Sequence, residues 1–379
     1  MSGFGIYVHV PFCSALCPYC DFAVVVGRQD RHAAYCDALI EEVRAQGDVP
    51  EATSLFIGGG TPTVLSPGLL RDLVKGILDA LPVSQCAEIT IEANPESVSE
   101  AGMRAAVDAG VNRVSIGAQS FTPHVLRALG RTHSVDQISS AVATARGAGI
   151  ENVSLDLIYG TNGETIEDWT GSLAKAIREE VDHISAYALT VEVATPFGKA
   201  VARGAMNEPD QDDLAAKYEI ACTTLERAGY HHYEISNWAR PGSESRHNLL
   251  YWMQGDYVGL GIGAHSHHGG RRWWNTRALG PYLADPANAR AGEEVLTESQ
   301  RDEEWLSLRM RLIDGIDLTD ATTRLGRDVR AAAAACERAG LLAINDNILR
   351  LTTRGMLLEN EVTLRLLDAP PLALDMVEC

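Results

Sequence analysis

The chain has no apolar run long enough to cross a membrane, and it has little positive charge. No apolar stretch approaches the ~20 residues that a membrane span requires, so we expect no membrane-spanning helix. The 379 residues carry 32 Lys and Arg against 51 Asp and Glu, a net charge of −19. Nucleic-acid binding depends on basic side chains that neutralise phosphates, so this balance disfavours such a partner. It also disfavours an anionic membrane surface, except at a local basic patch.

Cysteine is sparse, with 8 in the whole chain. A secreted disulfide scaffold would be short and dense in cysteine. No signal-peptide pattern precedes Cys13, so we expect a cytoplasmic protein. Five cysteines have no paired spacing, and we expect them to be small buried or terminal residues: Cys36, Cys86, Cys222, Cys336 and Cys379.

The other three cysteines have the spacing C-x-x-x-C-x-x-C. Cys13, Cys17 and Cys20 directly follow an apolar, strand-like run. Three thiolates can hold three irons of a [4Fe–4S] cluster and leave the fourth iron open. A structural zinc site would need a fourth Cys or His nearby. Phe22 stands where a further thiolate could have been, and His9 lies inside the strand. The triplet therefore favours the cluster.

Strands and helices alternate from residue 5 to about 190. Alternation at this spacing indicates parallel βαβ units. Six units favour an α/β fold, a partial TIM-like (β/α)6 barrel, with a doubly wound open sheet as the alternative. The predicted strands are 5–10, 53–58, 88–93, 112–117, 152–158 and 183–189.

Unusual residues stand where these strands end. In parallel barrels the functional groups lie at the carboxyl ends of the strands. The cysteine loop follows the first strand. The later ends carry Gly58, Gly59, Gly60 and Thr61, then Glu92, Gln119, Asp156 and Tyr187–Thr190. We therefore expect these groups to converge on one face.

We predict three parts: a barrel at 1–200, a His- and Trp-rich extension of the barrel at 201–298, and a C-terminal domain at 299–379. The last part combines helices with a short hairpin, a small α+β pattern typical of winged-helix-like modules. Residues 300–379 hold 10 Lys and Arg and 14 Asp and Glu, so 10 − 14 = −4. This charge favours a packing or partner-docking domain over a nucleic-acid binder.

The stretch Tyr7-Val-His-Val-Pro-Phe-Cys13 and the cysteine spacing resemble the signature of the radical S-adenosylmethionine (SAM) superfamily. Three further stretches narrow the resemblance to one group within this superfamily: Gly58-Gly-Gly-Thr-Pro-Thr, Gly117-Ala-Gln-Ser-Phe121 and Asp156-Leu-Ile-Tyr-Gly160. They are similar to the group that contains oxygen-independent coproporphyrinogen III oxidases (HemN type) and the related heme chaperones (HemW type). The resemblance covers nearly the whole chain.

The resemblance implies binding residues as well as cofactors. It implies a [4Fe–4S] cluster on Cys13, Cys17 and Cys20. The residues implied to contact SAM are Tyr7, Tyr19, Gly58, Gly59, Gly60, Thr61 and Glu92. The residues that match contacts of a second SAM in the oxidase are Gln119, Arg131 and Asp156.

Two features favour the chaperone over the oxidase. The oxidase signature has a further cysteine where this chain has Phe22. The chaperones carry His-Asn-x-x-Tyr-Trp, which matches His247-Asn248-Leu-Leu-Tyr251-Trp252. The chain departs from the family at Gly160-Thr161-Asn162, where Gly-Leu-Pro is usual. The oxidase remains the first alternative, and a nucleic-acid-modifying radical SAM protein the second.

Residues 231–280 contain six of the eleven histidines and four of the six tryptophans. Histidine is a common axial ligand of heme iron, so we expect heme binding there, with His247 as the preferred ligand. The same residues could instead build a core beside the barrel. The expected partners are heme and apo heme proteins that receive it, and no nucleic acid. Peripheral membrane association and a homodimer are left open.

Overall fold

The computed structural model describes residues 3–372 and divides the chain into two compact units. The larger unit runs to His231 and includes Ser236–Leu250 and Gly255–Glu294. The smaller unit contains His232–Ile235, Tyr251–Gln254 and the chain from Val295 onward. No helix within residues 3–372 combines the length and apolar character needed to cross a membrane. The finer three-part division stays a prediction.

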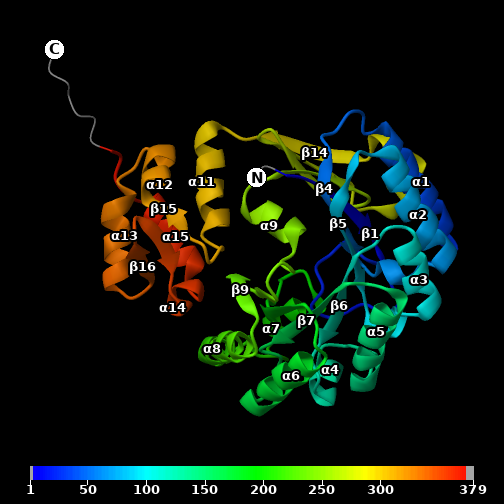
Figure 1. The fold of residues 1–379 in the computed structure, drawn as a ribbon, viewed down its shortest axis with the longest axis horizontal. Helices are drawn as coiled ribbons and strands as arrows, with labels where there is room; N and C mark the ends of the chain where they lie inside the picture. Colours follow the sequence, from blue (N-terminus) through cyan, green and yellow to red (C-terminus); the bar gives the residue numbers. More distant parts are fainter. Residues whose placement is uncertain (1–2, 373–379) are drawn as a thin grey trace. The chain divides into compact units, whose positions relative to one another are not determined.

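Parallel strands form the centre of the larger unit (Figure 1). They neighbour one another in chain order, as the barrel prediction requires. Their apolar runs are buried, which is typical of parallel strands covered on both faces. The strands are β1 (Phe4–Val10), β4 (Ala52–Gly59), β5 (Val83–Ala93), β6 (Arg113–Gln119), β7 (Asn152–Tyr159) and β8 (His183–Ala188).

Further strands make the sheet mixed. β11 (Asp256–Leu260) runs parallel to β1, and β12 (His265–His268), β13 (Arg271–Asn275) and β14 (Arg290–Val295) continue from it. At the other end, β10 (Asn237–Ala239) runs antiparallel to β8. The His- and Trp-rich segment thus supplies edge strands to the barrel sheet. A separate pair, β2 (Phe12–Cys13) and β3 (Val25–Val26), brackets most of the cysteine loop.

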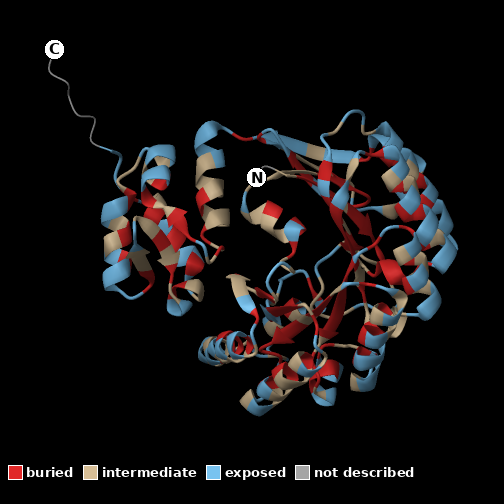
Figure 2. Cartoon of the chain, viewed as in Figure 1, coloured by how far each residue is buried: buried red, intermediate tan, exposed pale blue. Residues whose placement is uncertain are grey.

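Helices cover the outer face of the barrel strands, and the strands are the most deeply buried part of this unit (Figures 1 and 2). Side-chain caps begin three of these helices: Ser66 caps the helix that Pro67 begins, and Ser134 and Thr165 form capping boxes. The α-helices are α1 (His32–Ala45), α2 (Pro67–Ala80), α3 (Glu100–Asp108), α4 (Pro123–Ala128), α5 (Val135–Ala148), α6 (Ile166–Arg178), α7 (Pro196–Ala202), α8 (Gln211–Arg227), α9 (Arg246–Trp252) and α10 (Leu279–Ala284). Short 3-10 turns are η1 (Gln29–Arg31), η2 (Pro62–Val64), η3 (Pro95–Ser97) and η4 (Pro286–Asn288).

The smaller unit is the predicted α+β module. Its three-stranded sheet has the order β15-β17-β16, and its hairpin turns at Asp346 and Asn347, both with positive φ, as a two-residue type I′ turn requires. Helices pack on this sheet around a separate core that includes Leu306, Val329 and Val362. The elements are β9 (His231–Glu234), α11 (Glu298–Arg309), β15 (Ile316–Asp317), α12 (Leu318–Leu325), α13 (Val329–Arg338), β16 (Leu342–Asn345), β17 (Ile348–Leu351), α14 (Thr353–Met356) and α15 (Glu359–Leu367).

Leu358 leaves helical geometry and separates α14 from α15. One detail differs from the sequence prediction. Among the cysteines, Cys36, Cys222 and Cys336 are buried as expected, whereas Cys86 is exposed. Cys379 lies outside the described residues.

A buried ion pair holds α8 to the barrel. Lys217 is fully buried, and its Nζ lies 3.3 Å from a carboxylate oxygen of Glu164, whose side chain is equally buried. The same ammonium lies 2.7 Å from Asp213 and donates to the Glu164 carbonyl. The lysine neutralises a carboxylate that is cut off from water.

We predict that Lys217→Met lowers the free energy of unfolding by about 3 kcal/mol, because Glu164 would stay buried without its counter-charge. Urea unfolding measures the loss. Lys217→Met combined with Glu164→Gln should recover most of it. Lys75→Met, at an exposed position on α2, should change stability by less than about 0.5 kcal/mol. Equal losses in the single and double variants would contradict the explanation.

Candidate functional site

The cysteine loop is attached to β1 at both of its ends. Val25 N–H donates to the Pro11 carbonyl at 2.8 Å, and Thr61 N–H donates to the Phe12 carbonyl at 2.7 Å. His9 Nε2 lies 2.8 Å from the Ala23 carbonyl. A carbonyl can only accept, so Nε2 carries the proton and Nδ1 accepts from the Tyr7 hydroxyl at 3.0 Å. The strand therefore fixes where the loop begins and where it returns.

A cavity of about 530 Å³ opens at the carboxyl ends of the barrel strands. Most of the residues predicted from the sequence line it, although they come from five different strand ends. They are Cys13, Cys17, Tyr19, Cys20, Gly59, Gly60, Thr61, Glu92, Gln119, Arg131 and Asp156. The expected convergence on one face is thus present in the structure.

The three thiols suit a cluster better than a single ion. Thr61 Oγ1 donates to Cys13 Sγ at 3.7 Å, and an Arg131 N–H donates to Cys17 Sγ at 3.3 Å. Burial raises the pKa of Cys13 to about 11 and also raises that of Cys20. Within residues 3–372, no three His, Cys, Asp or Glu side chains are placed to hold one metal ion. In a cluster each sulfur binds a different iron, so the three sulfurs do not have to converge on one metal position.

Close approach explains the glycine run. A Cβ on Gly59, which has a φ of +103°, would lie 2.3 Å from His9 Nδ1. A Cβ on Gly60 would lie 2.6 Å from the backbone of Pro11, and one on Gly58 would lie 2.5 Å from a carboxylate oxygen of Glu92. Side chains here would push the turn away from β1 and displace Glu92.

Two carboxyl groups lie at the floor of the cavity. Burial and the neighbouring Asp156 raise the pKa of Glu92 to about 7, although the N–H of Gly59 donates to Glu92 at 2.9 Å. Burial also raises the pKa of Asp156, which accepts hydrogen bonds from Ser115 and Ser185. Glu92 is therefore close to the midpoint of its titration near neutral pH.

The end of β6 is conformationally unusual. Gln119 has a φ of +61°, in the left-handed region that non-glycine residues seldom occupy. The register between β6 and β7 also shifts between Ile116 and Gln119. Such strain is often found at functional positions, where the surrounding structure enforces it. Here the strained residue, Gln119, lines the cavity.

Three predicted residues do not line the cavity: Tyr7, Gly58 and His247. Gly58 lies against the Glu92 carboxylate, as the short distance from a Cβ at this position shows. The Tyr7 ring stacks on Phe56, with ring centroids 6.3 Å apart, and Phe56 in turn stacks on His247. His247 is only 1% exposed and lies 2.8 Å from the Ser54 hydroxyl. Burial, with the charge of Arg113, lowers its pKa to about 3. The structure therefore makes His247 a neutral interior group, and its role as heme ligand stays a prediction.

Sequence reasoning did not assign a role to Asn94, Ser115 or Ser185. All three follow or lie within predicted strands, and Asn94 and Ser115 line the cavity. The sequence signal for Asn94 was its place directly after the Glu92-Ala end of the third strand. The serines carried no signal, because single polar residues in strands are common.

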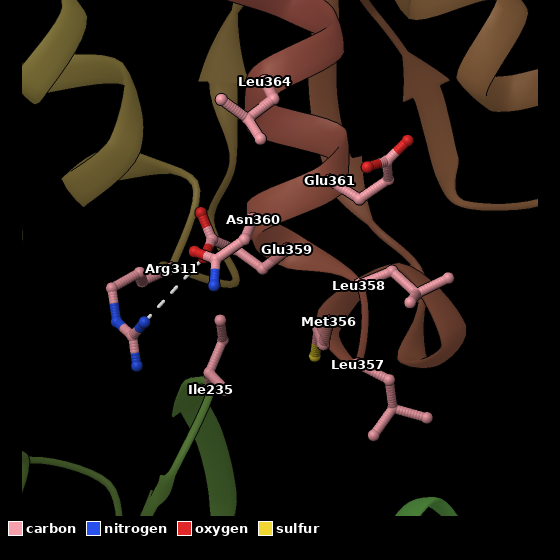
Figure 3. Close-up of a pocket in the computed structure, with 9 residues that line it drawn as sticks. All are labelled: Ile235, Arg311, Met356, Leu357, Leu358, Glu359, Asn360, Glu361 and Leu364. Atoms are coloured by element: carbon pink, nitrogen blue, oxygen red, sulfur yellow. Dashed lines mark ion pairs between the residues drawn. The ribbon is translucent and has the colours of Figure 1, made fainter. Parts of the chain in front are cut away.

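The smaller unit has a cavity of its own, of about 400 Å³ (Figure 3). Arg311 lies 3.9 Å from Glu359 across this cavity, and its guanidinium stacks over Trp252 at 4.5 Å. The remaining wall is mainly leucine and methionine, with no cysteine or histidine. The barrel cavity, which has the three thiols and two buried carboxyls with raised pKa, is therefore the candidate site.

The fold and the cysteine loop together define a radical SAM protein. Residues 7–176 match the radical SAM superfamily, and residues 296–358 match the HemN C-terminal domain. The chain belongs to the heme chaperone HemW family, as the sequence resemblance predicted. It is 40% identical to the heme chaperone HemW of Mycobacterium tuberculosis, over 96% of this chain and 95% of that protein. It is 36% identical to that of Bacillus subtilis, over 94% and 97%.

A further curated protein and a solved structure are also similar to this chain. The chain is 32% identical to the mitochondrial radical S-adenosyl methionine domain-containing protein 1 of Danio rerio, over 94% of this chain and 85% of that protein. The structure of coproporphyrinogen III oxidase (HemN) from Escherichia coli superposes with a TM-score of 0.83. It covers 97% of this chain and 90% of the oxidase at 23% sequence identity, a likeness that shows the fold alone.

We predict that Gly58→Ala lowers SAM affinity about tenfold, equivalent to about 1.4 kcal/mol. The new methyl group would occupy the place of the Glu92 carboxylate. Equilibrium dialysis of SAM against the reconstituted protein measures the change. Gly171→Ala on α6 is the matched control, because its Cβ would meet nothing within 4 Å. Equal affinities in the two variants would contradict the proposed place of Glu92 in the site.

Glu92 should also make stability depend on pH. Because its pKa is raised on folding, the protonated form is favoured in the folded state. The resulting stability is present below the unfolded pKa near 4.5 and is lost as pH rises through about 7. Relative to wild type, Glu92→Gln should therefore gain about 2 kcal/mol between pH 5 and pH 8. Urea unfolding across this range tests it, and a difference that stays constant with pH would refute it.

Proposed function

We propose that this protein is a heme chaperone: it holds a [4Fe–4S] cluster, binds SAM and heme, and delivers heme to apo heme proteins. The observation that carries the proposal is the cavity in which three cysteines, a glycine turn and Glu92 meet. Its support is the family membership, since relatives at 36–40% identity are named heme chaperones.

Each group at the cavity has a proposed part. Cys13, Cys17 and Cys20 hold the cluster, which when bound supplies the electron that cleaves a C–S bond of SAM. Glu92 accepts hydrogen bonds from the ribose hydroxyls of SAM, and the glycine turn lets the backbone approach the ligand. Tyr19 lines the cavity from the cysteine loop itself. Gln119, Arg131 and Asp156, which also line the cavity, are the proposed contacts of a second SAM.

The rim of the cavity suits a large apolar ligand. Phe22, at the position where the oxidases have a further cysteine, is 69% exposed. Leu16 and Tyr187 line the same cavity and are also exposed. Exposed apolar side chains gathered at one cavity mark interaction sites, and the flat face of heme would cover them. Ligation of heme by His247 would require its ring to leave the contact with Ser54.

The test compares two ligands in one preparation. After anaerobic reconstitution, a Cys13/Cys17/Cys20→Ala variant should lose the cluster, as measured by iron content and visible absorbance. It should bind heme with a dissociation constant within about twofold of wild type, because the apolar rim is intact. Cys86→Ala, at an exposed position outside the cavity, is the control and should keep both. Loss of all heme affinity in the triple variant would contradict separable sites.

A parallel assay addresses the alternative of oxidative decarboxylation. The same protein, given SAM, a reductant and coproporphyrinogen III, should form no product. Robust product formation would make the oxidase the correct function. Cytoplasmic localisation, peripheral membrane association and a homodimer stay predictions.

A further inference from the structure

We propose that Asn94 is a positioning residue that aims two hydrogen-bond donors at the sulfurs of Cys13 and Cys17 and so raises the reduction potential of the cluster. The inference rests on the proposed function in one respect: it requires that these cysteines hold the cluster.

A continuous chain of hydrogen bonds joins the two sulfurs. Asn94 Nδ2 donates to Thr61 Oγ1 at 2.8 Å, and Thr61 Oγ1 donates to Cys13 Sγ at 3.7 Å. On the other side, one terminal nitrogen of Arg131 donates to Asn94 Oδ1, and its second terminal nitrogen donates to Cys17 Sγ at 3.3 Å. The amide of Asn94 thus lies between both donors.

Proton counting fixes the direction of every bond in this chain. A guanidinium can only donate, so the oxygen of the Asn94 amide must face Arg131. The NH₂ group of the amide must then face Thr61. The Thr61 hydroxyl has one proton, and because it already accepts from Asn94, it points that proton toward Cys13 Sγ. Arg131 therefore orients the Asn94 amide, and the amide in turn directs the hydroxyl proton of Thr61 to Cys13 Sγ.

The backbone at Asn94 is held rigidly. Its N–H donates to Ser97 Oγ at 3.2 Å, and Ser97 Oγ donates back to the Asn94 carbonyl at 2.8 Å. Gly117 leaves room for the amide, since a Cβ there would lie 3.1 Å from Asn94 Oδ1. The Gly117 carbonyl accepts from the same Arg131 nitrogen at 3.3 Å. The amide is therefore positioned before any cofactor arrives.

Hydrogen bonds to the sulfurs are one of the ways in which a protein sets the potential of an iron–sulfur cluster. A donor withdraws electron density from the sulfur and stabilises the reduced cluster, which carries one more negative charge. The effect is strong in a site shielded from water. Outer groups that orient such donors therefore change the potential without touching the cluster.

The substitution Asn94→Asp isolates this role. The carboxylate has nearly the shape of the amide, and it can still accept from Arg131. It can no longer donate to Thr61, so the Thr61 hydroxyl turns its proton to the carboxylate and Cys13 Sγ loses its donor. The added negative charge acts in the same direction. Both effects stabilise the oxidised cluster.

The measurement is the midpoint potential of the reconstituted cluster, obtained by redox titration followed by electron paramagnetic resonance without SAM. At a fixed potential, Asn94→Asp should lower the ratio of reduced to oxidised cluster at least tenfold, which is about 59 mV for a one-electron couple. Thr61→Val, which removes the donor to Cys13, should shift the potential in the same direction. Thr170→Val on α6 is the matched control, because the Thr170 hydroxyl donates to the Ile166 carbonyl and to no residue of this chain of hydrogen bonds.

The double variant separates positioning from charge. If Asn94 acts partly through Thr61, Asn94→Asp should shift the potential less in the Thr61→Val background than in wild type. Equal shifts in both backgrounds would overturn the positioning role. The role would also be overturned if Asn94→Asp and Thr61→Val, at the iron content of wild type, had the wild-type midpoint potential. Should Asn94→Asp take up no cluster, the comparison of Thr61→Val with Thr170→Val decides. A wild-type protein that takes up no cluster would refute the proposed function instead.

Discussion

The junction between β1 and the glycine turn after β4 is the constraint on which the rest of the site depends. Gly60 N–H donates to the Val10 carbonyl at 2.8 Å, and Thr61 N–H donates to the Phe12 carbonyl at 2.7 Å. These bonds extend the parallel ladder past the ends of both strands. They place the Thr61 hydroxyl beside Cys13, and they hold Gly59 where its N–H meets Glu92. The cysteine loop and the carboxylate are thereby fixed to one backbone junction.

The barrel and most of its cavity could be predicted from the sequence for a physical reason. Parallel strands are buried on both faces, so each is a short apolar run, and the observed bounds differ from the predicted ones by a few residues at most, apart from the longer start of β5. Parallel pairing also forces all carboxyl ends to one edge. Because Asp156 belongs to β7, parallel pairing brings it near the other strand ends whatever its function.

The interior of the barrel could not be predicted, because its polar partners are distant in sequence. His247 was interpreted as a ligand from its motif and the aromatic residues around it. Its hydroxyl partner, Ser54, is 193 positions away, and nothing in either segment indicates the pair. Asn94 shows the same limit: the sequence places it at a strand end, but its role follows only from which of its atoms faces Arg131.

Charge in this acidic chain is distributed unevenly around the cavity. Arg131 lies against the cysteine sulfurs, and Arg113, which is 2% exposed, acts on Glu92, Asp156 and His247 from inside the barrel. Burial raises the pKa of both carboxyls on the floor, which disfavours two buried anions in one cavity. A positive charge that enters the cavity lowers the pKa of such a carboxyl. A cation bound beside the floor would therefore favour the ionised carboxylates, while Thr61 and Arg131 donate to the cysteine sulfurs.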